Sequence, residues 1–194
     1  EGVDARPVNF IFHCGHVGST LLSRLLDETE QVLSLREPLP LRVLADGYSA
    51  LSRRDAPISE EKLNAYFDMF MKLWSRGYAN TRQVIVKATS STARIGSRLF
   101  EARPKIRAVY MSLQAEPYLA TLLGGANSNI DLKSYAPERM RRLEEYLKQS
   151  FPPAHLFAGG ELAAMSWLTE RLTGKKLLAS FGSQIMPLDF EDML

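Results

Sequence analysis

The feature that most constrains the fold lies near the start of the chain, where an apolar run, a glycine turn and a helix signal follow one another. Residues 8–14, VNFIFHC, form an almost unbroken apolar run of strand length, which is typical of a strand buried on both faces. The turn that follows contains Gly15 and Gly18, and Ser19-Thr20 then opens a segment with leucines at helical spacing. A strand, a glycine loop and a helix in this order predict the first half of a βαβ unit.

Further strands and helices alternate along the chain. Short apolar runs predict strands at 31–36, 84–86, 106–111 and 185–190. Helical patterns and proline or serine starts predict helices at 38–45, 59–76, 92–102, 117–123, 137–150 and 160–171, with polar loops at 46–58 and 126–134. This alternation predicts an α/β fold, a single three-layer domain with a mainly parallel central sheet flanked by helices.

The length of 194 residues suits one domain of ordinary size, and no long linker divides the chain. We therefore assign residues 1–194 to one domain. Within it, residues 46–80 are interpreted as a loop plus helix that form a lid on the substrate side.

Composition excludes several classes of function. Lysine and arginine number 24 against 22 acidic residues, and a net charge of +2 argues against a nucleic-acid coat or a membrane-surface protein. The single cysteine, Cys14, excludes an intrachain disulfide framework, and with three histidines we expect no metal site. The start, EGVDARP, lacks the pattern of a secretory signal, and no apolar run is long enough to span a bilayer, so we expect a cytoplasmic protein.

The glycine turn is suited to a phosphate or sulfate group. Backbone N–H groups of such a turn converge at a helix start, where the helix dipole also favours an anion. Against the pattern G-x-x-x-x-G-K-[ST], Gly18 takes the second glycine, Ser19 the lysine and Thr20 the hydroxyl position, while His13 stands at the first glycine. Because the lysine is absent, the loop is predicted to hold a phosphate without ordinary triphosphate hydrolysis.

Four segments, in the same order along the chain, resemble motifs of the sulfotransferase family. HVGSTLL (16–22) resembles the family's phosphosulfate loop, [KR]-S-G-T-T-[WL]-L, and LREP (35–38) its glutamate-proline step. VIVKAT (84–89) is similar to the family's strand that ends in lysine-threonine-histidine, and LDFEDML (188–194) to a late strand end. The chain thus resembles a divergent bacterial sulfotransferase, and the resemblance implies a P-loop α/β domain that uses 3′-phosphoadenosine 5′-phosphosulfate (PAPS) as co-substrate.

The resemblance implies a donor site and three catalytic residues. The donor would be held by Gly15, His16, Val17, Gly18, Ser19, Thr20 and Leu21, with backbone N–H groups and two hydroxyls on the 5′-phosphate. His16, in the family's lysine or arginine position, would stabilise charge on the bridging oxygen if protonated. Lys87 would contact the sulfuryl oxygens. Glu37 would take the acceptor proton, because Thr89 stands at the position of the family's catalytic histidine.

One family motif is missing. After the fourth strand the family reads the 3′-phosphate with an arginine and a serine, but the corresponding stretch here is MSLQAEPYLATLL, in which Ser112 is the polar residue that remains. We include Ser112 in the predicted donor site. The acceptor is expected to be a small molecule, or a sugar or peptide hydroxyl, or an amine.

Two other functions stay open. A small-molecule kinase or nucleotide-binding protein could use the same loop, although the missing lysine weakens that interpretation. A non-catalytic relative could keep the fold and bind a nucleotide or partner, which the missing arginine favours. Both residues also have a purely structural explanation: His16 could pack within the loop, and Glu37 could be an acidic residue at a helix start.

Overall fold

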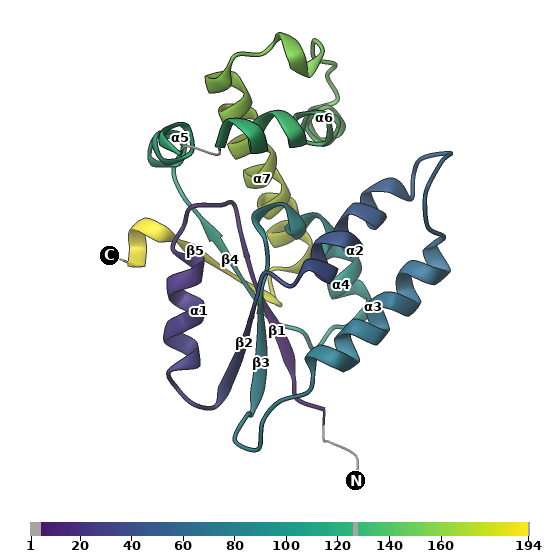
Figure 1. Ribbon diagram of the computed structural model, residues 1–194, viewed down its shortest axis with the longest axis vertical. Helices are drawn as coiled ribbons and strands as arrows, with labels where there is room; N and C mark the ends of the chain where they lie inside the picture. Colours follow the sequence, from purple (N-terminus) through teal and green to yellow (C-terminus); the bar gives the residue numbers. More distant parts are fainter. Residues whose placement is uncertain (1–4, 126–127, 194) are drawn as a thin grey trace.

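The computed structural model describes residues 5–125 and 128–193, and within them a five-stranded parallel sheet forms the centre (Figure 1). The strands lie in the order β2-β3-β1-β4-β5. Their bounds are β1 (Val8–His13), β2 (Val32–Arg36), β3 (Gln83–Lys87), β4 (Ala108–Ser112) and β5 (Ile185–Asp189). The predicted α/β fold with a parallel central sheet is confirmed.

Helices follow the strands and cover both faces of the sheet. The α-helices are α1 (Ser19–Asp27), α2 (Leu39–Ala50), α3 (Glu60–Trp74), α4 (Gly96–Ala102), α5 (Ala115–Gly124), α6 (Ser128–Leu147) and α7 (Gly159–Phe181). Short 3₁₀-helices occur at η1 (Ser90–Ile95), η2 (Ala154–Leu156) and η3 (Phe190–Met193). Among the described helices, none is both long enough and apolar enough to cross a membrane.

The core has two parts, one on each face of the sheet. Phe10 and Phe12 of β1 point to the face that α2, α3, α4 and α7 cover, where Phe12 also contacts the ring of Phe100 edge-on. Ile11 points to the other face and packs with apolar side chains of α1, α5 and α6. Burial on both faces explains why the sequence of β1 is apolar throughout rather than alternating.

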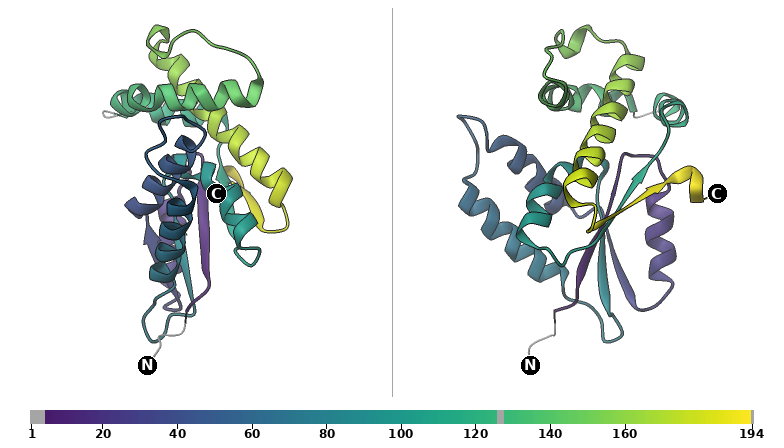
Figure 2. Two further views of the ribbon diagram at one scale, coloured as in Figure 1. Left: turned by 90° about the vertical axis from the view of Figure 1, so that its right-hand side faces the viewer. Right: turned by 180° about the vertical axis from the view of Figure 1, so that it is seen from behind.

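Helices α5 and α6 lie beyond the ends of the strands, as both Figure 1 and Figure 2 show. We call this end of the sheet, where all five strands finish, the carboxyl edge. The loops that leave β1, β2 and β3 begin there, so it is the edge at which an open parallel sheet binds ligands.

Most predicted elements are confirmed, including the strands and the serine-capped helix, in which Ser59 Oγ accepts a hydrogen bond from the N–H of Lys62 at 3.2 Å. Two loop predictions were wrong. Residues 46–50 of the predicted loop 46–58 belong to α2, because Gly47 packs closely against Leu63 of α3 and so continues the helix instead of ending it.

The predicted loop 126–134 was also wrong from Ser128 onward, while its residues 126 and 127 lie outside the described residues. Helix α6 begins at Ser128 and contains Pro137, which we had interpreted as a helix start. Leu132, Ala136, Met140 and Leu143 are buried in one core and recur at helical spacing on both sides of the proline. Burial of that continuous apolar face outweighs the hydrogen bond that the proline removes.

Helix α7 extends ten residues past its predicted end at Arg171, through Gly174, to Phe181. A Cβ atom at Gly174 would lie 2.2 Å from a ring carbon of Tyr110. That ring is buried and fixed, since its hydroxyl donates a 2.6 Å hydrogen bond to the carbonyl of Glu170. Glycine at 174 therefore allows α7 to approach β4 closely.

We predict that Gly174→Ala lowers the free energy of unfolding by about 1–3 kcal/mol, because the added methyl group collides with the Tyr110 ring. Gly160→Ala, in the first turn of the same helix, is the matched control, since a Cβ there meets nothing within 4 Å. It is expected to be neutral or to stabilise by up to about 1 kcal/mol. Urea denaturation measures both; equal effects at the two sites would contradict the assigned contact.

Candidate active site

The glycine loop, residues 14–18, joins β1 to α1 and adopts a backbone that two glycines make possible. Gly15 has φ = 108° and Gly18 has φ = 67°, both in the left-handed region. A Cβ atom at Gly18 would also lie 2.6 Å from a ring carbon of Phe190, and one at Gly15 would lie 3.4 Å from Tyr118. The glycines are therefore required by both conformation and packing.

The start of α1 offers unpaired backbone donors. The first N–H groups of a helix have no partner within the helix, and Gly18 supplies no side-chain cap. No acidic side chain occupies the first turn of α1. The Thr20 side chain is exposed, whereas Ser19 and Val17 are buried, so Val17 can offer only its backbone. Leu21, in the same turn, is 57% exposed. Because its backbone N–H groups are unpaired, this end of α1 is suited to a phosphate or sulfate group.

Lys87, the last residue of β3, is paired with Glu37, which follows β2. Lys87 Nζ donates a hydrogen bond to Oε1 of Glu37. The Lys87 side chain is 3% exposed and that of Glu37 is 49% exposed. The structure therefore brings together two predicted catalytic residues that are 50 positions apart in the sequence.

Glu37 has an unusual backbone conformation for a non-glycine residue. Its φ is 51°, and its N–H donates a 2.7 Å hydrogen bond to the carbonyl of Lys87. A left-handed conformation at such a residue costs on the order of 1 kcal/mol and is concentrated at functional sites. His16, in the glycine loop, has φ = 55° and is the second strained residue of the site.

His13 lies under the site and was not predicted to take part in it. Its Nε2 is 2.8 Å from the carbonyl of Ala88, so Nε2 carries the proton and donates. Its buried Nδ1 has no hydrogen-bond partner among the described residues. Burial, and secondly the charge of Lys87, lower the pKa of His13 to about 4, against a smaller opposing effect of Glu37. His13 is therefore neutral at pH 7.

His16 is exposed at the loop, with its ring 5.8 Å from that of Tyr118 in an edge-to-face arrangement. Desolvation lowers the pKa of His16 below its usual value, although the charge of Asp131 on α6 opposes that shift. Without a bound anion the ring is therefore mainly neutral at pH 7, and one of its two nitrogens can donate a hydrogen bond. The protonated form that we considered from the sequence requires a more acidic pH or a nearby anion.

Ser112, at the end of β4, is committed to another partner. Its hydroxyl donates a 3.3 Å hydrogen bond to Oδ2 of Asp189 at the end of β5. Ser112 is thus at the same edge of the sheet as the glycine loop, but the negative charge beside it disfavours a phosphate. Phe190, the next residue along, is the one that packs on Gly18, so the late motif adjoins the glycine loop.

The sequence analysis did not identify three residues that lie above the carboxyl edge, namely Arg42, Tyr135 and Arg139. Tyr135 of α6 lies between two guanidinium groups, that of Arg42 from α2 at 4.9 Å from its ring centroid and that of Arg139 at 5.6 Å. Arg139 is buried and its Nε lacks a partner among the described residues. The sequence signal was weak, because Tyr135 fell in a segment interpreted as the boundary between a loop and a helix.

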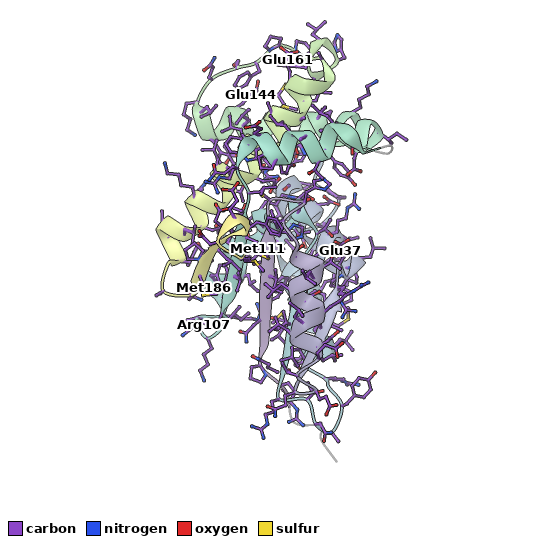
Figure 3. All side chains as sticks on the ribbon, turned by 90° about the vertical axis from the view of Figure 1, so that its left-hand side faces the viewer. Glu37, Arg107, Met111, Glu144, Glu161 and Met186 are labelled. Carbon is purple, nitrogen blue, oxygen red and sulfur yellow. The ribbon has the colours of Figure 1, made fainter. Side chains whose placement is uncertain are left out.

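The predicted site residues therefore gather at one edge of the sheet. In Figure 3, Glu37 lies at the height of Met111 near the end of β4, below α6, whereas Arg107 lies at the opposite end of that strand. Cys14 is buried and burial raises the pKa of its thiol to about 12, which excludes a thiolate nucleophile at pH 7. Within the described residues, no group of three or more metal-ligating side chains is found.

Comparison with solved structures identifies the fold. The sulfotransferase from Alicyclobacillus acidocaldarius superimposes with a TM-score of 0.53 at 20% identity, covering 97% of this chain and 75% of that one. The sulfotransferase domain from the curacin biosynthetic pathway gives 0.55 at 13% identity, covering 99% and 69%. The sequence matches no protein-family model and no curated protein. The chain has the sulfotransferase fold, as the four motifs led us to expect.

The state of His13 predicts how stability depends on pH. Its pKa is lower in the folded than in the unfolded chain, so the unfolded chain binds more protons and the stabilisation present above pH 6.5 is lost as the pH falls to about 4. A shift from 6.5 to about 4 corresponds to a loss of about 3 kcal/mol. Urea denaturation at pH 7, 5.5 and 4.5 measures it.

His13→Asn should lose that part of the pH dependence, whatever its stability at pH 7. His155→Asn, at an exposed histidine of η2, is the control and should keep the dependence of the unmodified chain. The same slope in all three proteins would show that the His13 ring is not held neutral.

Proposed function

We propose that this chain transfers a sulfuryl group from a donor of the PAPS type to a hydroxyl or amine acceptor. The observation that carries the proposal is the contact between Lys87 and Glu37 at the carboxyl edge of a sulfotransferase fold. A carboxylate half exposed to solvent and a buried ammonium, next to an anion-binding loop, are the groups that such a reaction needs.

The glycine loop fits the phosphosulfate end of the donor. The left-handed Gly15 and Gly18 turn backbone N–H groups outward at the start of α1, and the exposed Thr20 hydroxyl can add a hydrogen bond. His16 extends from the same loop with a neutral ring, which donates a hydrogen bond to an oxygen of the group being transferred. The donor supplies the sulfuryl group and leaves as adenosine 3′,5′-bisphosphate.

Glu37 and Lys87 have different roles in the transfer step. Glu37 accepts the proton of the acceptor as the new bond to sulfur forms, and the bond from sulfur to the bridging oxygen breaks. Lys87 holds the carboxylate in position and supplies positive charge near the sulfuryl oxygens. The strained backbone of Glu37 keeps its carboxylate at this point of the edge.

A second candidate function is nucleotide binding without transfer, and the contact between Ser112 and Asp189 favours it. A 3′-phosphate at this strand end would face the Asp189 carboxylate in place of the family's arginine. A donor or nucleotide that lacks the 3′-phosphate fits the edge better. The acceptor, the cytoplasmic location and the single domain with a lid at 46–80 stay predictions from the sequence.

Glu37→Gln tests the catalytic assignment. Sulfuryl transfer from ³⁵S-labelled PAPS to a panel of hydroxyl and amine acceptors should fall roughly a hundredfold or more, because the amide cannot take the proton. Donor affinity should stay within a factor of two. Glu28→Gln, at the exposed end of α1 away from the loop, is the matched control and should leave turnover unchanged. Unchanged turnover in the Glu37 variant would rule out this mechanism.

Thermal melting with nucleotides tests the donor. Adenosine 3′,5′-bisphosphate at a hundred times its Kd should add about 2.7 kcal/mol, which raises Tm by several degrees. If Asp189 repels the 3′-phosphate, Asp189→Asn should increase the shift with the bisphosphate but not with ADP. A shift with ATP alone would favour a kinase, and equal shifts with ADP and bisphosphate in both proteins would remove the role assigned to Asp189.

A further inference from the structure

A polar cavity lies away from the glycine loop, among the helical elements α2, η1, α4, α6 and α7. Its volume is about 300 Å³, and it is lined by the end of α2 with the loop after it, by η1 and α4, by α6, and by α7. Its lining includes no residue of the glycine loop, nor Glu37 or Lys87. Tyr48, in its wall, lies nine residues along α2 from Leu39, which corresponds to about 14 Å of helix.

Four cationic side chains line this space, which we call the arginine cavity: Arg94, Arg141, Arg142 and Lys176. Glu145 is the carboxylate among the lining residues. The side chains of Arg94 and Arg142 are 6% and 4% exposed, so two guanidinium groups are almost wholly withdrawn from water. Such groups need anionic or hydrogen-bonding partners to offset the loss of hydration.

Carboxylates within the chain satisfy these groups in part. Arg142 pairs with the buried Glu170 at 2.9 Å, yet its buried Nε has no partner among the described residues. Arg94 contacts Asp46, which is not part of the lining. Arg141 forms two further ion pairs, with Glu138 at 3.1 Å and with Glu145 at 3.6 Å.

Lys176 completes the positive side of the arginine cavity. Its ammonium group lies 5.6 Å from the centroid of the Tyr146 ring, and Lys176 forms no ion pair with the described residues. Arg142 opposes the charged form of both Arg94 and Arg141, although burial is the larger cause of the lowered pKa of Arg94, and the hydrogen bond with Glu138 keeps the pKa of Arg141 raised. An anion between them would reduce that repulsion.

The rest of the lining suits a small organic ligand. Hydroxyl groups of Ser49, Ser97 and Tyr48 can donate hydrogen bonds, while Leu51 and Leu177 provide apolar surface. The volume of about 300 Å³ is at the lower end of the range for small-molecule sites. We propose that the arginine cavity binds a small phosphate or sulfate monoester, at a site separate from the active site.

Isothermal titration calorimetry with phenyl phosphate at low ionic strength tests the proposal, because this probe carries both a dianion and a small apolar body. Arg141→Ala and Lys176→Ala each remove one cation from the lining, and we expect about a tenfold rise in Kd for either. Lys175→Ala is the matched control: Lys175 is exposed, adjacent in α7 and absent from the lining. It should bind as the unmodified chain does.

Gly18→Ala separates the two anion sites, since it alters the glycine loop and leaves the arginine cavity intact. Its affinity for phenyl phosphate should be unchanged. Circular dichroism melting verifies that each variant is folded. No binding to the unmodified chain, equal Kd values for Lys176→Ala and Lys175→Ala, or loss of binding in Gly18→Ala would each overturn the proposal. These outcomes do not depend on sulfuryl transfer, so the two proposals can fail separately.

Discussion

The buried charge of Lys87 is the constraint on which the candidate active site depends. An ammonium group that is 3% exposed needs a partner, because its lost hydration must be replaced. Glu37 provides that partner, and its N–H is bonded to the Lys87 carbonyl as well. The ends of β2 and β3 are thus fastened together. Glu37 adopts an unfavourable left-handed backbone conformation, and its carboxylate contacts the lysine while half of the Glu37 side chain still faces solvent.

Side chains from distant parts of the chain pack against the glycine loop. Phe190 covers Gly18, and Tyr118 lies against Gly15 and the ring of His16. The loop therefore contacts both α5 and the segment after β5. Helix α6 adds the cation–π arrangement of Tyr135 with Arg42, which connects α6 to α2 above the carboxyl edge. An anion bound at the loop would therefore lie near residues from distant parts of the chain, as expected for a site at the strand ends of a parallel sheet.

Elements with a strong local signal could be predicted from the sequence, and those that depend on packing could not. The apolar strand β1 and the serine cap of α3 are local features, and both were found. Pro137 was interpreted as a helix start, Gly47 was placed in a loop and Gly174 lay past the predicted end of its helix, but each lies inside a helix. At Gly47 and Gly174 the absent side chain allows a neighbour to approach, and at Pro137 a buried apolar face continues across the proline. These compensations come from partners far away in the sequence.

The sequence alone determined the order of the strands and helices along the chain, the position of the glycine loop and the residue types available for chemistry. Residue type and spacing are sufficient for this, because secondary structure follows local periodicity and turn chemistry. The tertiary structure decided which of those residues meet. It paired Lys87 with Glu37, left His13 neutral beneath them and gave Ser112 an acidic neighbour. Burial and charge at these positions arise from contacts between segments dozens of residues apart, and local sequence patterns do not predict such contacts.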